Sequence, residues 1–250
     1  MAATKVQKLA TISDLHLFCR RSQADRFRDA IHEAAAASDV FVLNGDIFDF
    51  RWSTLVSPEQ TVVSAIAWLT ELIEAAPHCT FHYVLGNHDH YGIFMDALEV
   101  FAEAHANFEW SPYYLRLGTA LFVHGDVTIR KMTGADLEQY RAGWLEDANR
   151  GPVANAVYDV AFKFGVHKAV HHVAFPLSAV LERLHHYVED IGHGASGGVE
   201  TVYFGHTHLA MPHHRHNGLI FRNSGAPMPG LKFHVLTADL PIEEVNVQNS

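Results

Sequence analysis

The sequence contains little cysteine and no excess of positive charge. Only Cys19 and Cys79 occur among 250 residues, which excludes a framework of several disulfides. Acidic residues outnumber basic residues by 28 to 18, so the formal net charge is −10 with histidine neutral. A general nucleic-acid-binding surface requires a basic excess, and we therefore expect no such binding.

Long apolar runs are also missing. No stretch approaches the roughly 18 uncharged apolar residues that a membrane span requires, and the first ten residues lack the apolar core of a signal peptide. Together with the scarcity of cysteine, this pattern predicts a cytoplasmic protein. Peripheral contact with the inner face of a membrane stays open, because Lys163, Lys168 and Arg183 lie on predicted amphipathic helices. The oligomeric state is left open as well.

The sequence does contain five short apolar runs, each followed at once by a polar block. The runs are 9–12, 40–43, 81–85, 121–123 and 202–204. Runs of this length that are rich in β-branched or aromatic residues indicate buried strands. Helical patterns at 22–37, 58–76 and 91–106 separate the first runs, and this alternation predicts a layered α/β fold. In such a fold the ligand crevice lies outside the carboxyl ends of the strands.

Residues 128–198 carry no strand signal. The pattern predicts helices at 135–149, 153–175 and 177–191, followed by a glycine-rich return. We interpret 128–198 as a helical cap subdomain inserted within a single domain that spans 1–250. Beyond it, Asn217-Gly218 between two strand-like segments predicts a hairpin.

The polar blocks supply seven oxygen and imidazole donors. They are Asp14, His16, Asp46, Asn87, His124, His206 and His208. A donor set without thiolate suits manganese, iron or zinc in a reactive site better than a structural zinc site. A carboxylate such as Asp46 has two oxygens and can bridge two cations. Two metal ions about 3.5–4 Å apart can clamp the oxygens of an in-line displacement and lower the pKa of a shared water.

In order along the chain, these blocks resemble the motifs of the calcineurin-like metallophosphoesterases. The matching motifs are D-x-H (Asp14, His16), G-D-x-x-D (Gly45, Asp46, Asp49), G-N-H-D (86–89), H-G (His124, Gly125) and G-H-T-H (205–208). The resemblance implies a four-layer α-β-β-α sandwich with two divalent metal ions at the strand ends. It favours manganese, with iron or zinc as alternatives.

The resemblance also implies a role for each donor. One metal ion would be held by Asp14, His16, Asp46 and His208, and the other by Asp46, Asn87, His124 and His206. His88 would be the general acid that protonates the leaving oxygen, and Asp49 would orient and charge it. A carboxylate beside an imidazole favours the imidazolium form, which can donate a proton.

The predicted function is therefore that of a dinuclear-metal-dependent phosphoester hydrolase, in which a metal-bridging hydroxide attacks phosphorus in line. The stretch 45–52 and the helical insertion resemble in part the UDP-2,3-diacylglucosamine hydrolases, which act on a pyrophosphate. His88 stands where that branch commonly has arginine, so the predicted substrate is either a phosphorylated small molecule or a lipid-linked one. Candidate substrate contacts near the ligand blocks are His90, Arg51, Arg130 and Lys131.

Two other interpretations remain at this point. The same fold can serve as a non-catalytic scaffold that presents its cap or hairpin to a protein partner. A nuclease would use the same metal centre, although a net charge of −10 disfavours that substrate.

Overall fold

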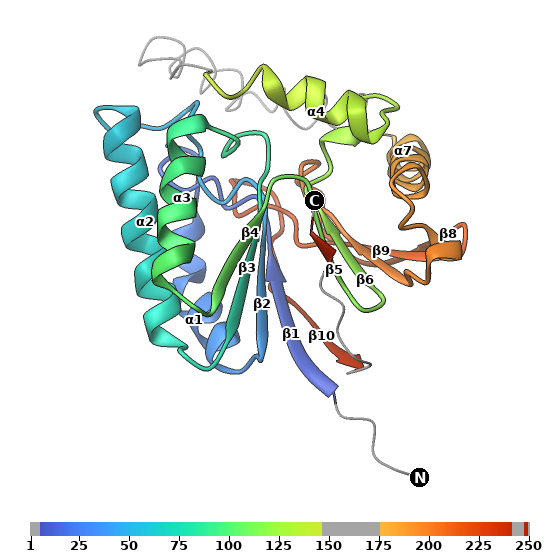
Figure 1. Cartoon of the computed structure of the whole chain (residues 1–250), viewed down its shortest axis with the longest axis horizontal. Coiled ribbons are helices and arrows are strands. Elements are labelled where there is room, and N and C mark those ends of the chain that lie inside the picture. Colours follow the sequence, from blue (N-terminus) through green and yellow to red (C-terminus); the bar gives the residue numbers. More distant parts are fainter. Residues whose placement is uncertain (1–5, 147–175, 242–247, 250) are drawn as a thin grey trace.

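Two β-sheets lie face to face at the centre of the molecule (Figure 1). The computed structural model describes residues 6–146, 176–241 and 248–249. The first sheet has the strand order β10-β1-β2-β3-β4. Its strands are β1 (Val6–Ile12), β2 (Val40–Asn44), β3 (Thr80–Val84), β4 (Phe108–Ser111) and β10 (Leu236–Pro241). Strands β1 to β4 are parallel, and β10 is antiparallel to β1.

The second sheet has the order β11-β5-β6-β7-β9-β8. Its strands are β5 (Tyr114–Leu117), β6 (Ala120–Val123), β7 (Thr201–Tyr203), β8 (Met211–His216), β9 (Leu219–Asn223) and β11 (Gln248–Asn249). Strands β6, β7 and β9 are parallel, while β8 pairs with β9 as an antiparallel hairpin. Asn217 and Gly218 in its turn have φ values of 46° and 84°, as a primed turn requires, so the predicted hairpin is confirmed.

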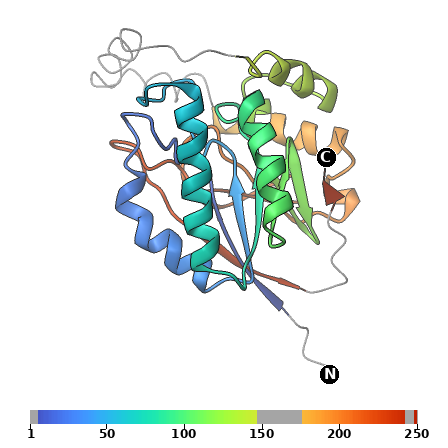
Figure 2. The ribbon, with the colours of Figure 1, turned by 60° about the vertical axis from the view of Figure 1, so that its left-hand side comes forward.

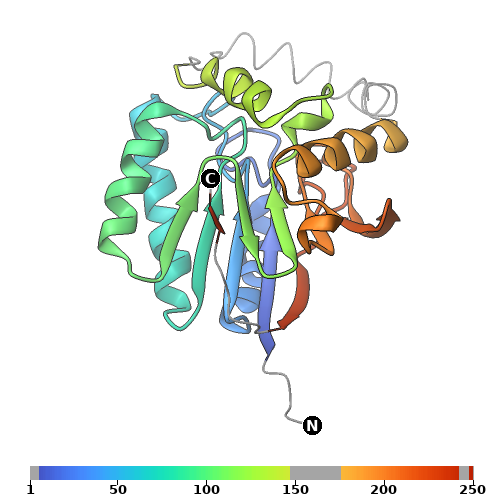
Figure 3. The ribbon, with the colours of Figure 1, turned by 45° about the vertical axis from the view of Figure 1, so that its right-hand side comes forward.

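Helices cover the outer face of each sheet. Helices α1 (Arg28–Ala36), α2 (Pro58–Ala75) and α3 (Gly92–Ala104) lie against the first sheet (Figure 2). Helix α2 begins where the sequence predicts, because Pro58 takes its first position and Ser57 Oγ accepts a hydrogen bond from Gln60 N at 3.2 Å. Helix α7 (Leu177–Asp190) covers the second sheet (Figure 3). Short 3-10 helices occur at Ala24–Phe27, Asp126–Thr128 and Ala195–Gly197.

Three apolar clusters hold these layers together. The first joins α1, α2 and α3 to the first sheet, and the second joins α7 to the second sheet. The third lies between the sheets, where Leu9, Val42 and Val84 meet Phe122 and Tyr203. The architecture is therefore a four-layer α-β-β-α sandwich, as predicted, and no single layer could bury its apolar face alone.

The described residues of the range 128–198 form helices and connecting loops but no strand. Helix α4 (Gly134–Ala142) lies over the strand ends (Figure 3), and α7 forms the outer layer on the second sheet. The predicted first helix, 135–149, is thus shorter than expected. The predicted helix at 153–175, with Lys163 and Lys168, lies outside the described residues, and the boundary of a cap subdomain stays a prediction. No described helix is long and apolar enough to cross a membrane.

Candidate metal centre

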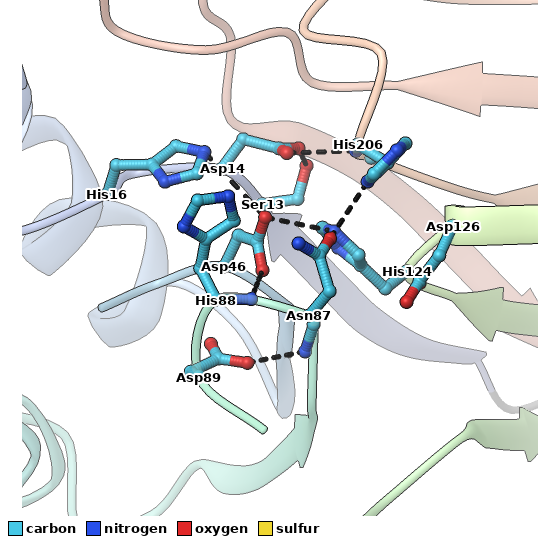
Figure 4. Close-up of polar contacts among 12 residues, drawn as sticks. Ser13, Asp14, His16, Asp46, Asn87, His88, Asp89, His124, Asp126 and His206 are labelled. Carbon is cyan, nitrogen blue, oxygen red and sulfur yellow. Dashed lines mark hydrogen bonds and ion pairs between the residues drawn. The ribbon is translucent and has the colours of Figure 1, made fainter. Parts of the chain in front are cut away.

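Five loops meet at the carboxyl ends of β1, β2, β3, β6 and β7 (Figure 4). Backbone hydrogen bonds fix the first two loops to each other, because Asp14 N donates to Gly45 O at 3.0 Å and His16 N donates to Asp46 O at 2.9 Å. The structure brings together all seven predicted donors, which come from positions as far apart as 14 and 208 in the chain.

Asp14, His16 and His208 form one cluster. Each offers a ligand atom within 4.8 Å of the others. The Nε2 atoms of His16 and His208 are 3.0 Å apart, and His208 Nε2 lies 3.5 Å from Asp14 Oδ1. The loops of this cluster are also tied by His206 N, which donates to Asp14 Oδ1 at 2.8 Å.

Asp46, His124 and His206 form a second cluster, in which the ligand atoms also lie within 4.8 Å of one another. Asp46 Oδ2 lies 3.1 Å from His124 Nε2, and His206 Nδ1 lies 3.0 Å from the side-chain oxygen of Asn87. The same Asp46 Oδ2 is 3.8 Å from Nε2 of His16, which belongs to the first cluster. Asp46 therefore lies between the two clusters, as a bridging carboxylate would.

The residues fit a pair of divalent cations. Asp14, His16, Asp46 and His124 are buried, while His206 and His208 are partly exposed. These imidazole and carboxylate donors include no thiolate, which suits manganese, iron or zinc. His124 Nε2 is buried and lies 3.1 Å from Asp46 Oδ2. An imidazole nitrogen and a carboxylate oxygen are the two kinds of ligand atom that such cations take in proteins.

The backbone at the donors is unusual. Asp14, His16, Asp46, His206 and His208 have φ values of 55°, 46°, 51°, 61° and 56°. A residue other than glycine in this left-handed region costs about 1–3 kcal/mol and persists only where the surroundings enforce it. Strain at five donors, each just past a strand, marks these loops as a site rather than as ordinary turns.

His88 and Asp49 form an ion pair beside the clusters. His88 Nδ1 lies 3.0 Å from Asp49 Oδ1, and Trp52 N donates to the same oxygen at 2.8 Å. Burial lowers the pKa of His88, but the Asp49 and Asp46 carboxylates outweigh it and raise that pKa to about 9. Burial raises the pKa of Asp49, but His88 and His16 hold it well below its usual range. The pair is therefore imidazolium and carboxylate at neutral pH.

The four predicted substrate contacts differ from one another in their burial and in the residues that surround them. The Arg51 guanidinium stacks on the Trp144 ring, with its carbon 4.4 Å from the ring centroid, and that ring lies 5.6 Å from the His88 ring. His90 is buried, 6.0 Å from the Tyr113 ring. Arg130 and Lys131 are exposed, and no contact between them and the two clusters is found among the described residues.

Residues outside the seven predicted donors hold the loops in place. Buried Asp89 accepts hydrogen bonds from Ile47 N at 3.0 Å and Tyr83 Oη at 2.6 Å, which joins the second and third loops. Ser13 Oγ donates to Asp14 Oδ2 at 2.5 Å and contacts Ser224 Oγ at 2.7 Å. Asp89 belongs to the G-N-H-D motif, but the bonding partners of Asp89 and Ser224 are distant in the chain and left no local signal in the sequence.

The close approach of Gly86 to Asp46 gives a prediction. A Cβ on Gly86 would lie 2.1 Å from Asp46 Oδ1 and 2.4 Å from Asp46 N. Gly86→Ala must displace the shared carboxylate, so we expect it to lower metal content and to destabilise the protein by about 1–3 kcal/mol. Urea unfolding and elemental analysis measure both effects. Gly143→Ala is the control, because its Cβ would meet Tyr140 O at an ordinary 3.6 Å; equal behaviour of the two variants would contradict the prediction.

A family comparison identifies the fold and site together. The model of the calcineurin-like phosphoesterases matches residues 7–210, which include all five loops. The chain belongs to this family. It is a phosphoester hydrolase of the calcineurin-like type, and the family and the two clusters together suggest a dinuclear divalent-metal site. The resemblance seen in the sequence motifs is thereby confirmed.

Solved structures similar to this calcineurin-like phosphoesterase are distant in sequence. One is the phosphopantetheinyl hydrolase from Mycobacterium tuberculosis, with 12% identity, a TM-score of 0.47 and coverage of 90% of this chain and 92% of that chain. Another is a dimetal phosphatase from Danio rerio, with 12% identity, a TM-score of 0.45 and coverage of 96% and 95%. A sequence comparison with curated proteins gives no match.

Proposed function

We propose that this phosphoester hydrolase works with two manganese ions at the strand ends. One ion would be held by Asp14, His16, Asp46 and His208, and the other by Asp46, Asn87, His124 and His206. The observation that carries the proposal is the pair of largely buried clusters with Asp46 between them, its Oδ2 lying 3.1 Å from His124 Nε2 and 3.8 Å from His16 Nε2. When bound, the two ions supply Lewis acidity and an activated water for attack on phosphorus.

The chain's own residues supply the proton for the leaving group. Nδ1 of His88 faces Asp49, so the proton available for transfer is carried by Nε2. Asp49 holds the ring in one orientation and keeps it charged, and Trp52 N fixes the carboxylate in turn. We assign His88 the role of general acid toward the leaving oxygen and Asp49 the role of its orienting partner.

The substrate is a phosphorylated compound whose leaving group faces His88. The stacked Arg51 and Trp144 side chains beside that histidine support contacts with the leaving group, and we retain a small phosphorylated molecule or a lipid-linked pyrophosphate as its class. We also propose that the protein acts in the cytoplasm, with or without peripheral contact with the membrane.

The test is metal removal followed by reconstitution. Protein treated with a chelator and dialysed is expected to lose hydrolysis of an aryl phosphodiester, and added Mn²⁺ is expected to restore it more fully than Fe²⁺ or Zn²⁺. The reconstituted protein is then assayed on phosphomonoesters, nucleotide sugars, UDP-linked lipids and single-stranded DNA. A protein that binds two ions but hydrolyses none of these compounds would contradict the proposal and favour the scaffold interpretation.

A further inference from the structure

Arg141 is a buried arginine at the end of helix α4. Its guanidinium is fully enclosed and donates four hydrogen bonds. Nε and Nη2 bind the two carboxylate oxygens of Asp126 at 2.6 and 2.8 Å. Nη1 donates to Leu85 O and to Pro112 O, both at 2.8 Å. The planar fork of arginine suits this arrangement, and a lysine ammonium cannot reproduce it.

The partners of Arg141 belong to two different donor loops. Asp126 follows His124 by two residues in the loop after β6, which belongs to the second sheet; Figure 4 places the two side chains side by side. Leu85 directly precedes Gly86 and Asn87 in the loop after β3, which belongs to the first sheet. One side chain therefore connects the loop that carries His124 to the loop that carries Asn87.

The connection is ionic as well as hydrogen-bonded. The two side chains are joined by a pair of parallel hydrogen bonds, and neither is exposed to water. A charged pair of this kind tolerates little change in its geometry, because each buried charge depends on the other.

The other cluster has no such contact with Arg141. Asp14 and His16 are fixed by Gly45 O, Asp46 O and Ser13, and His208 belongs to the loop after β7. Within the part of the chain that the structure describes, the hydrogen bonds from the Arg141 guanidinium go to Asp126, Leu85 and Pro112. These hydrogen bonds are therefore directed at one side of the metal centre.

We propose that Arg141 is a positioning residue that sets the distance between His124 and Asn87 and so determines the affinity for one of the two metal ions. The inference rests on the proposed function, because it requires that these two residues hold an ion. Hydrogen-bond partners that orient metal ligands typically account for about 10–100-fold in metal affinity.

The experiment is calorimetric titration of metal-free protein with Mn²⁺. Arg141→Lys keeps the charge but loses the fork, and we expect it to bind one equivalent as wild type does and the other about 10–100-fold more weakly. Arg116→Lys is the matched control. Arg116 is a half-buried arginine that donates to Gly118 O and Gly197 O, away from the donor loops; this variant should bind both equivalents normally.

A second variant guards against loss of folding. Asp126→Leu combined with Arg141→Met removes both buried charges, so neither remains unpaired. Near-UV circular dichroism of the metal-free proteins reports whether each variant is folded. The titration is interpreted for each of these variants, Arg141→Lys or the double variant, that is folded. If the variant binds one of its two Mn²⁺ ions more weakly than wild type and the other as tightly as wild type, the inference is supported. If the affinities for both ions are unchanged, or both fall by the same factor, the inference is overturned.

The same titration separates the two claims. If wild-type protein binds no Mn²⁺, the proposed function fails and this inference fails with it. If wild type binds two ions, and His124→Ala loses one while Arg141→Lys and the double variant lose neither, the metal centre stands and only the role of Arg141 is overturned.

Discussion

Asp46→Asn is expected to abolish binding of both metal ions and to reduce phosphoester hydrolysis by more than the ~10–100-fold that follows loss of an outer hydrogen-bond partner. Asp46 Oδ2 lies 3.1 Å from His124 Nε2 and 3.8 Å from His16 Nε2, so it serves both clusters. Asparagine tolerates the φ of 51° at this position and can still accept the hydrogen bond from His88 N. The variant should therefore fold while losing the charge that both cations require.

Elemental analysis of the purified variant measures the loss. Asp39→Asn is the matched control, because Asp39 lies just before β2 and Asp46 just after it. The Asp39 carboxylate accepts a hydrogen bond from Lys8 N at 2.8 Å and belongs to neither cluster. If Asp46→Asn retained about two ions per chain, as wild type is proposed to do, the bridging assignment would be wrong.

The His88→Asn variant is expected to keep both metal ions. Its rate of hydrolysis should fall most for esters whose leaving oxygen is most basic. General acids contribute about 10²–10⁴-fold to such reactions. We expect a loss of that size with alkyl phosphoesters and a loss under about tenfold with a p-nitrophenyl ester, whose leaving oxygen needs little protonation. The difference arises because His88 faces Asp49 and is a member of neither of the two clusters on either side of Asp46, although it lies within 4.8 Å of ligand atoms of His16 and Asp49.

Steady-state kinetics on a series of esters with leaving groups of rising pKa measures this effect. His32→Asn serves as the control, since His32 lies on α1, 3.9 Å from Glu71, and is far in the sequence from every donor loop. A parallel loss of activity on every ester, or a loss of metal, would argue that His88 acts on the centre itself and not on the leaving oxygen.

The sequence predicted most of the elements that carry the site. The carboxyl-terminal parts of strands β1, β2, β3, β6 and β7 are buried on both faces, so they appear as short, largely apolar runs that end in polar residues. Strands β4 and β10 lie at the edges of the first sheet and are only partly buried, so neither contains an apolar run long enough to detect. Helix α4 ends at Ala142, where Gly143 follows, rather than at 149.

The contacts that hold the donors could not be predicted in the same way. Arg141 reaches Asp126 across 15 residues, Pro112 across 29 and Leu85 across 56. Local patterns report which face of a helix is apolar, and an arginine is expected on the exposed face. Its burial depends on distant partners that only the folded chain brings together. The same holds for Ser224, which reaches Ser13 across 211 residues.

The left-handed backbone at five donors lowers the thermal stability of the protein, but it belongs to residues that the metal site requires. Glycine adopts such a backbone freely, whereas histidine or aspartate does so at a cost. Glycine in place of His208 would relax its loop and delete a donor in one step. Selection for thermal tolerance alone would then drive these loops toward inert turns. Substitutions intended to raise the thermal stability of the protein should therefore be made in the helical layers of the sandwich and not at these five positions.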